Sequence, residues 1–335
     1  MRVVDYIANR LSELGVKFVY GVTGGGASGL NDGFIKNSKI KFICFHHEQG
    51  AGHAAVGESK ATKKISIVNP TTGCGGTNCI TSVLDAWQDS LPVIFISGNV
   101  RKNHTTFCLN RDKKISLRKY GIQEHNIIPT VKSITKYAKF IEKPEEIPYE
   151  LDYAINKALS DRMGPVWLDI PGDVQHAELP KNFKIFKKNI IKNKSLNINI
   201  ENYIKKYSKP LILAGYGITL SNSQENFRKF IDKYEIPFVT TYLGIDIIEY
   251  DHPLNIGTIG IKGSRAGNFA IQNCDLLIII GSSLNSSHVG YDEKLFSPHS
   301  YKIMVDIDKN EFQKETIQIN KFLNINIEDF LKQYE

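Results

Sequence analysis

The chain has 335 residues, of which 41% are hydrophobic and 23% are charged, and its formal net charge is +7 at pH 7. This composition is typical of a folded globular protein, and it excludes disordered, collagen-like and disulfide-stapled chains. At about 150 residues per domain, the length predicts two domains, which is ample for a buried core.

Hydrophobic stretches are short throughout the chain. The longest strongly apolar run covers residues 276–280, far below the roughly 20 residues that a transmembrane helix requires. The first fifteen residues place Asp5, Arg10 and Glu13 among apolar positions, which predicts an amphipathic helix and not a signal peptide. We therefore expect a cytoplasmic protein with no membrane partner.

The positive net charge raises the question of a nucleic acid partner. Lysine is densest in residues 181–194, and such a block more often marks a solvated linker than a surface that binds phosphates. Because no nucleic-acid-binding motif accompanies the lysines, we expect no nucleic acid partner.

The cysteines are odd in number and form no CxxC pair. They therefore match neither a zinc site nor a disulfide framework, which agrees with a reducing compartment. They are Cys44, Cys74, Cys79, Cys108 and Cys274.

The first half of the chain alternates between helix-type and strand-type segments. Strands that are apolar throughout and alternate with helices are typical of a parallel sheet covered on both faces. The pattern predicts strands within residues 17–22, 41–48, 64–70, 91–98 and 165–173, and helices within 1–15, 49–62, 79–90 and 148–161. Residues 101–125 are expected to be irregular. We expect a doubly wound α/β domain over residues 1–178.

The second half repeats this alternation after a connector rich in lysine and asparagine. We expect a linker over residues 179–200 and a second, Rossmann-like parallel α/β domain over residues 201–335. Strands are predicted within 210–218, 236–244, 276–284 and 302–308, and helices within 223–234 and 261–275.

Several glycine-rich turns follow predicted strands, where open α/β sheets bind their ligands. Gly24, Gly25 and Gly26 end the first strand, and Gly215 and Gly217 follow a strand in the second half. Neither turn is a GxGxxG fingerprint, and no Walker A sequence is present, so each is a weak nucleotide signal.

Glu48 is the most informative single residue because it closes an apolar strand. Burial of an unpaired carboxylate costs several kcal/mol, so a carboxyl there favours a functional role, such as sharing a proton with a ring nitrogen at a raised pKa. His46, His47 and His53 lie nearby, but their spacing does not match a helical metal-binding pattern, and we expect no metal there.

These residues belong to a series of blocks that resembles a known family. GVKFVYGVTGG, FHHEQGAGHAAVGESKATKK, TTGCGGTNCITSVLDAWQDSLPVIFISGNV, GIQEHNIIPTVKSITKYA and GPVWLDIPGDVQ resemble the pyrimidine-binding domain of thiamine diphosphate enzymes of the acetolactate synthase type. PLILAGYGI, IPFVTTYLG, NIGTIGIKGSRAGNFAIQNCDLLIIIGSSL and KIMVDIDKNEF resemble the central domain of the same enzymes. The resemblance covers nearly the whole chain.

The resemblance implies roles for particular residues. Glu48 would hydrogen-bond N1′ of the aminopyrimidine of the cofactor, which promotes loss of the thiazolium C2 proton, and Gln123 would face the substrate. The loops that would wall the cofactor contain Val22, Thr23, Gly24, Thr71, Thr72, Cys74 and Asn78. Thr23 and Cys74 stand where the family usually has proline, which implies a pocket unlike that of housekeeping acetolactate synthases.

The resemblance also implies a third domain that this sequence does not contain. The family holds the diphosphate through Mg²⁺ bound by a GDG motif and a later asparagine. We reject Gly172-Asp173 with Asn197 or Asn199 as that motif, because Gly172-Asp173 matches the end of the first domain. We therefore expect Mg²⁺ to bind through a domain outside this chain. FAD, for which the candidate contacts are Gly215, Gly217, residues 258–263 and Asp306, is not expected.

The resemblance therefore predicts part of a thiamine diphosphate-dependent 2-keto acid decarboxylase or carboligase, a transferase or lyase. We expect a homodimer that needs a partner domain or chain carrying the GDG motif. Two alternatives stay open: a non-catalytic pseudo-enzyme or regulatory subunit, and a nucleotide-binding protein that uses only the central domain.

Overall fold

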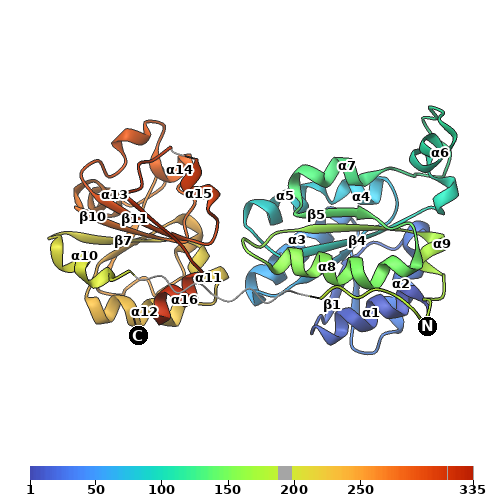
Figure 1. Cartoon of the computed structure of the whole chain (residues 1–335), viewed down its shortest axis with the longest axis horizontal. Coiled ribbons are helices and arrows are strands. Elements are labelled where there is room, and N and C mark those ends of the chain that lie inside the picture. The colour runs from blue at the N-terminus through green and yellow to red at the C-terminus, as the bar shows by residue number, and fades with distance from the viewer. Residues whose placement is uncertain (188–197, 315, 335) are drawn as a thin grey trace. The chain divides into compact units, whose positions relative to one another are not determined.

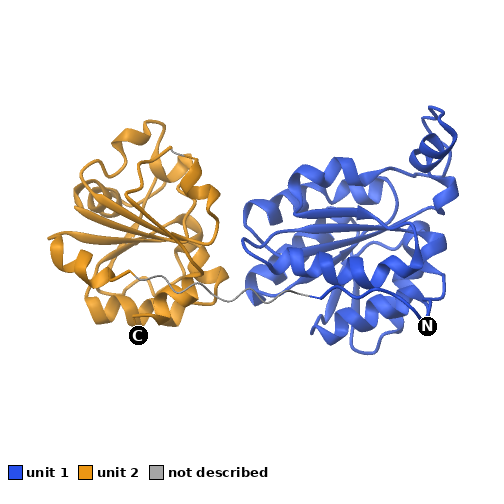
Figure 2. Cartoon of the chain, viewed as in Figure 1, with its two compact units in different colours: residues 1–189 blue, residues 190–335 orange. Residues whose placement is uncertain are grey.

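The structure is a computed structural model that describes residues 1–187, 198–314 and 316–334. The chain divides into two compact units, residues 1–189 and 190–335 (Figures 1 and 2). Residues 188–197 of the expected linker, Asn197 among them, lie outside the described residues. No helix in the described ranges has the length and hydrophobicity to span a membrane.

Unit 1 is built on a six-stranded sheet in the order β2-β1-β3-β4-β6-β5, in which every pairing is parallel. Its central strands β3, β4 and β6 are buried at every residue, because helices cover both faces. The strands are β1 (Phe18–Gly21), β2 (Lys41–Cys44), β3 (Ser66–Asn69), β4 (Val93–Asn99), β5 (Tyr137–Phe140) and β6 (Val166–Pro171). This confirms the predicted parallel α/β fold.

The helices of unit 1 bury apolar stripes against this sheet. Val4, Ile7 and Leu11 of α1 and Leu151 of α8 share one core cluster with the strands, as the helical spacing of these apolar residues requires. The helices are α1 (Val3–Glu13), α2 (Ser28–Lys36), α3 (Glu48–Thr62), α4 (Cys74–Asn78), α5 (Ile80–Gln88), α6 (Thr106–Lys113), α7 (Ile127–Val131), α8 (Ile147–Leu159) and α9 (Gly172–Gln175).

Unit 2 has a second parallel sheet, in the order β12-β11-β10-β7-β8-β9. Its strands are β7 (Pro210–Ala214), β8 (Phe238–Thr240), β9 (Asn255–Thr258), β10 (Leu276–Ile280), β11 (Tyr301–Asp306) and β12 (Lys321–Asn324). Its helices are α10 (Ile200–Lys206), α11 (Gly217–Leu220), α12 (Gln224–Tyr234), α13 (Arg265–Asn273), α14 (Ser286–Val289), α15 (Asn310–Gln313) and α16 (Ile327–Lys332). The predicted second α/β layer structure is confirmed.

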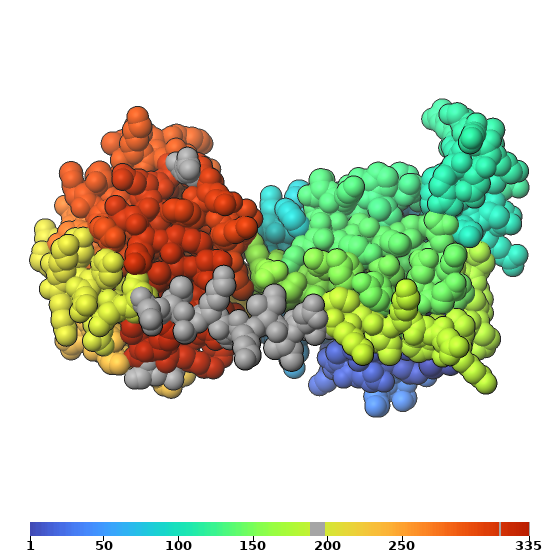
Figure 3. Space-filling view, viewed as in Figure 1, coloured from blue at the N-terminus to red at the C-terminus, as the bar shows by residue number. Residues whose placement is uncertain are grey.

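Several element boundaries differ from the sequence prediction. Strand β2 ends at Cys44, so Glu48 is the first residue of α3 and does not close a strand. The stretch 101–125, expected to be irregular, contains helix α6, which stands out from the body of unit 1 (Figures 1 and 3). Its polar composition gives it no apolar stripe, and residues 111–120 are all exposed, so the helical period could not reveal it.

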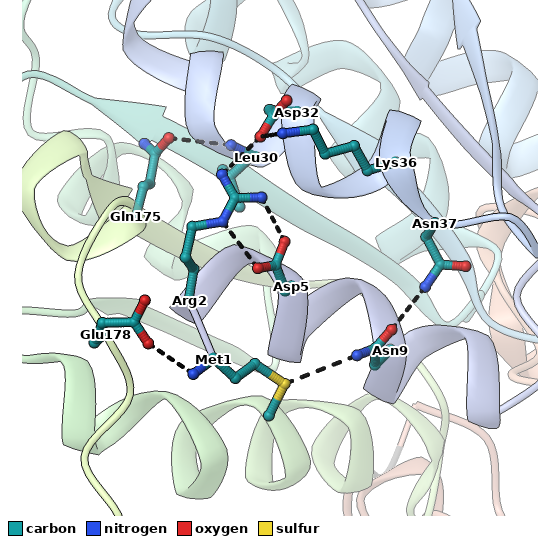
Figure 4. Close-up of polar contacts among 10 residues, drawn as sticks. All are labelled: Met1, Arg2, Asp5, Asn9, Leu30, Asp32, Lys36, Asn37, Gln175 and Glu178. Carbon is teal, nitrogen blue, oxygen red and sulfur yellow. Dashed lines mark hydrogen bonds and ion pairs between the residues drawn. The ribbon is translucent and has the colours of Figure 1, made fainter.

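Gln175 ties the glycine-rich turn of unit 1 to the end of β6. Its side chain is fully buried; Nε2 donates to the carbonyl oxygens of Gly26 and Ile170, both at 2.7 Å, and Oε1 accepts from the backbone N–H of Leu30 at 3.2 Å. Figure 4 shows the bond from Leu30 to Gln175 and also Arg2, which joins α1 to α2 through Asp32. One amide therefore satisfies three backbone groups from two chain segments.

Replacing Gln175 by Ala is expected to destabilise unit 1 by about 3 kcal/mol, because three buried backbone groups lose their partner. Both tryptophans, Trp87 and Trp167, lie in unit 1, so tryptophan emission during urea unfolding measures this effect. The matched control is Gln88→Ala at an exposed position of α5, which should stay within about 0.5 kcal/mol of the parent protein. Equal stability of the two variants would contradict the role of Gln175.

Candidate functional site

Loops at one edge of the unit 1 sheet border a cavity of about 890 Å³. Because all six strands run in the same direction, the segments that follow their carboxyl ends meet at this edge. The segments that follow β1, β3, β4 and β6 supply most of the lining. The lining residues are Thr23, Gly24, Gly25, Gly26, Ser28, Thr71, Thr72, Asn99, Val100, Arg101, His104, Ile122, Gln123, Gly172, Asp173, His176 and Ala177. We take this cavity as the candidate ligand site of unit 1.

The glycines of the first loop allow the walls of the cavity to pack closely. A Cβ on Gly24 would lie 2.4 Å from Oγ1 of Thr71, and one on Gly26 would lie 1.6 Å from Oγ1 of Thr72. A Cβ on Gly98 of β4 would lie 2.1 Å from the carbonyl oxygen of Gly26. Glycine is therefore required at these positions by loop-to-loop contact, and that contact shapes the cavity wall.

Glu48 begins α3 beside this wall, and only 9% of it is exposed. Asn78 at the end of α4 donates from Nδ2 to Oε2 of Glu48 at 2.9 Å. Oε1 lies next to Gly75, where an added Cβ would be 3.1 Å away, and no described residue donates a hydrogen bond to it. The N-terminus of α3 also favours the negative charge of this carboxylate.

Thr71 connects the Glu48 carboxyl to the cavity. A Cβ on Gly75 would lie 2.7 Å from Cγ2 of Thr71 and 3.1 Å from Oε1 of Glu48, and Thr71 itself lines the cavity. The Glu48 oxygen that accepts no hydrogen bond from a described residue therefore lies close to the wall of the cavity.

The sequence-predicted site residues fall into two groups. Thr23, Gly24, Thr71, Thr72 and Gln123 line the cavity. Glu48 and Asn78 form the hydrogen-bonded pair beside it, whereas Val22 is half-buried in the first loop and Cys74 is exposed at the first residue of α4.

Gln123 is exposed and has a backbone φ of +57°, a conformation that is uncommon for a residue with a side chain. The loop after β3 supports it from one side, since a Cβ on Gly73 would lie 1.8 Å from the carbonyl oxygen of Gln123. Gly73 itself has φ of +60°. The loop after β3 and the segment around Gln123 therefore meet through backbone atoms, and Gln123 lines the cavity.

Sequence reasoning missed a buried polar network behind the cavity. Asp169 of β6 accepts hydrogen bonds from Oγ of Ser97 at 2.7 Å and from Nδ2 of Asn99 at 2.8 Å, both on β4. Trp167 donates from Nε1 to Oγ of Ser97 at 2.8 Å and stacks on Phe95. The sequence held one sign of this network, which is that Asp169 interrupts the otherwise apolar segment VWLDIP.

Burial raises the pKa of Asp169 to about 7, against the opposite effect of its hydrogen bonds from Asn99 and Ser97. Its exposure is 1%, so removal from water dominates over the two hydrogen bonds that favour the carboxylate. The group therefore changes charge near neutral pH inside the folded protein.

The three histidines near Glu48 have separate surroundings. His47 caps α3 by accepting from the N–H of Gln49 at Nδ1, His53 pairs with Asp85 at 3.1 Å, and His46 is exposed. Within the described ranges, no group of three or more His, Cys, Asp or Glu side chains is arranged to hold a metal ion. Asp173 accepts from the N–H of Lys102.

The glycines considered for FAD in unit 2 are explained by packing. A Cβ on Gly215 would lie 2.1 Å from the carbonyl oxygen of Gly281, and one on Gly217 would lie 2.7 Å from its Cα. Asp306 accepts from the backbone N–H of Asp308 at 2.9 Å. Close packing between the two loops therefore accounts for glycine at positions 215 and 217.

Two family profiles match the chain. The profile described as the N-terminal TPP binding domain of thiamine pyrophosphate enzymes matches residues 1–128, and that described as their central domain matches residues 199–333. The chain belongs to the thiamine diphosphate enzyme family. Thiamine pyrophosphate and thiamine diphosphate are two names for one cofactor.

Curated relatives are acetolactate synthase large subunits. The chain is 32% identical over 323 residues to that of Lactococcus lactis, covering 92% of this chain and 52% of the relative. It is 33% identical to a probable large subunit from Methanocaldococcus jannaschii (94% and 52%) and 31% identical to that of isozyme 2 from Escherichia coli (94% and 55%). The chain spans about half the length of these relatives.

The fold is also that of a solved structure. An X-ray structure of a protein from Mycobacterium smegmatis, assigned to the thiamin diphosphate-dependent enzymes, superposes with a TM-score of 0.82 at 18% identity. The match covers 99% of this chain and 62% of that one. At this identity the likeness supports the fold alone.

The stability of unit 1 is expected to depend on pH through Asp169. Because its pKa is raised in the folded state, the unfolded chain loses this proton at lower pH, and stability falls as pH rises from about 4 to about 7. Urea unfolding followed by tryptophan emission should show that the parent protein loses about 3 kcal/mol relative to Asp169→Asn between pH 5 and pH 8. Parallel pH profiles of the two proteins would contradict the shift.

Proposed function

We propose that this chain is the pyrimidine-binding and central part of a thiamine diphosphate-dependent enzyme that decarboxylates a 2-keto acid and ligates the product to a carbonyl acceptor. The observation that carries the proposal is the Glu48 carboxyl, which is buried, held at one oxygen by Asn78 and open at the other. Membership in the thiamine diphosphate enzyme family supports it.

The cofactor fits the residues present. The Cβ position of Gly75 lies 3.1 Å from Oε1 of Glu48 and 2.7 Å from Cγ2 of Thr71, so this carboxyl oxygen is close to a residue that lines the cavity. When bound, thiamine diphosphate supplies a carbon nucleophile and an electron sink for 2-keto acids. In the proposed site, Glu48 shares a proton with a nitrogen of the aminopyrimidine ring, and Asn78 fixes the orientation of that carboxyl.

The remaining predicted residues bind and orient. Val22, Thr23, Gly24, Thr72 and Cys74 belong to the loops that would enclose the ring. Gln123, which lines the same cavity, would donate or accept a hydrogen bond on the substrate side. Thr23 and Cys74 remain our candidates for a substrate preference that differs from housekeeping acetolactate synthases.

The substrate and assembly are part of the same proposal. Relatives described as acetolactate synthase large subunits support a 2-keto acid such as pyruvate. We propose a homodimer, and a diphosphate-binding domain with a GDG motif and Mg²⁺ that comes from outside the residues described. FAD is not part of the proposal. We place the protein in the cytoplasm, where its five free cysteines stay reduced.

The experiment is Glu48→Gln in an assembly that contains the diphosphate-binding domain and thiamine diphosphate. Exchange of the thiazolium C2 proton with deuterium, followed by NMR, should slow by about 10²- to 10⁴-fold, because an amide cannot take part in the proton transfer. Turnover of pyruvate or another 2-keto acid should fall with it.

The matched control is Glu58→Gln, the same change further along α3, where the carboxyl lies beside Tyr20. It should leave C2 exchange near the parent rate. Fast exchange in Glu48→Gln would remove Glu48 from this role, and an assembly that neither binds thiamine diphosphate nor consumes a 2-keto acid would contradict the proposed function.

A further inference from the structure

Asn99 bridges the buried network to the segment that carries Gln123. Its Nδ2 donates one hydrogen to Oδ2 of Asp169 at 2.8 Å and one to the backbone carbonyl of His125 at 3.2 Å. Its Oδ1 accepts from the N–H of Val100 at 2.9 Å. The amide nitrogen of Asn99 thus faces two acceptors and its oxygen faces one donor, which fixes the orientation of the amide.

The segment around Gln123 is thereby held at two points. Gly73 meets the carbonyl oxygen of Gln123 from the β3 side, and Asn99 binds the carbonyl oxygen of His125 two residues later. Asn99 also lines the cavity and is 2% exposed. The position of Gln123 therefore depends on where Asp169, itself bonded to Ser97, holds Asn99.

We propose that Asp169 is a positioning residue that acts through Asn99 to set the place of Gln123 in the cavity. The role given to Gln123 rests on the proposed function, whereas the mechanical link does not. A carboxylate accepts a stronger hydrogen bond than a neutral acid or amide does. Asn99, and with it residues 122–125, is held more firmly when Asp169 is ionised.

Of the other ionisable side chains on the elements around Asp169, Lys132 and Tyr149 are exposed, Lys136 donates to the carbonyl oxygen of Ser160, and the rest have partners of their own. Those elements are β5, α7, α8, α9 and residues 124–142. The partnerships are Lys139 and Tyr137 with Glu150, Asp152 with Arg10, Lys157 with Tyr153, His125 with Thr130, Glu124 with Thr106, Glu142 with Arg111, and Asp173 with the N–H of Lys102. Asp169 is thus the ionisable group that bonds directly to Asn99.

The test is hydrogen–deuterium exchange of the full chain without cofactor, in the parent protein and in Asp169→Asn, between pH 5.5 and pH 8.5. The ratio of the two rates at each pH cancels the intrinsic pH dependence of exchange. At pH 8.5 the amides of residues 122–126 should exchange about tenfold faster in the variant, because the charge-assisted bond is lost. At pH 5.5 the ratio should approach one, because the protonated acid and the amide are both neutral.

Two further variants separate positioning from a general loss of structure. In an Asn99→Ala background, Asp169→Asn should cause no additional change in residues 122–126, because the link is already removed. Asp161→Asn, the same change at an exposed site between α8 and β6, should leave this segment at the parent rate.

The results distinguish this proposal from the proposed function. A ratio of one at both pH values, or an equal rise across β3 and β4, overturns the positioning role. If the segment responds as expected but the assembled protein binds no thiamine diphosphate, the positioning stands and the proposed function fails. If the assembled protein binds thiamine diphosphate and consumes a 2-keto acid but residues 122–126 do not respond, the proposed function stands and the positioning role fails.

Discussion

The site depends on one constraint, which is that all six strands of unit 1 run in the same direction. Parallel pairing sends every loop that follows a strand to the same edge of the sheet. Residues far apart in sequence, such as Thr23, Thr71 and Gln123, therefore line one cavity. Glycine at positions 24, 26 and 98 then lets these loops pack closely, against the Thr71 and Thr72 side chains and the backbone of Gly26.

Two buried carboxyls of unit 1, Glu48 and Asp169, differ in what their oxygens can bind. Glu48 sits at the N-terminus of a helix with one oxygen bound by Asn78 and the other open beside Gly75, so it can meet a ligand. Asp169 is enclosed by Ser97 and Asn99 and meets only protein groups. The first carboxyl is placed to exchange a proton with a bound base, and the second to hold an amide in position.

The sequence predicted the parallel sheets and most central strands, because apolar runs such as 91–98 need no tertiary context to be recognised. It failed at edge strand β5, whose four residues are all half-buried, and at α6, which has no apolar face. Glu48 could be singled out as a carboxyl next to an apolar strand, and Asn78 could be named only through the family resemblance; the hydrogen bond between them was not predicted. The Asp169 network could not be predicted, because the hydrogen bonds to Ser97 and Asn99 follow from the register of β4 on β6.

The central claim is that the open oxygen of Glu48 receives the aminopyrimidine ring, and a crystal structure of the thiamine diphosphate-loaded assembly tests it most directly. We predict a ring nitrogen within about 2.6–3.2 Å of Oε1 of Glu48, with Asn78 still bound to Oε2 and Gln123 in the wall of the cavity. A ring bound at another edge of the protein, with no contact to Glu48, would contradict the account.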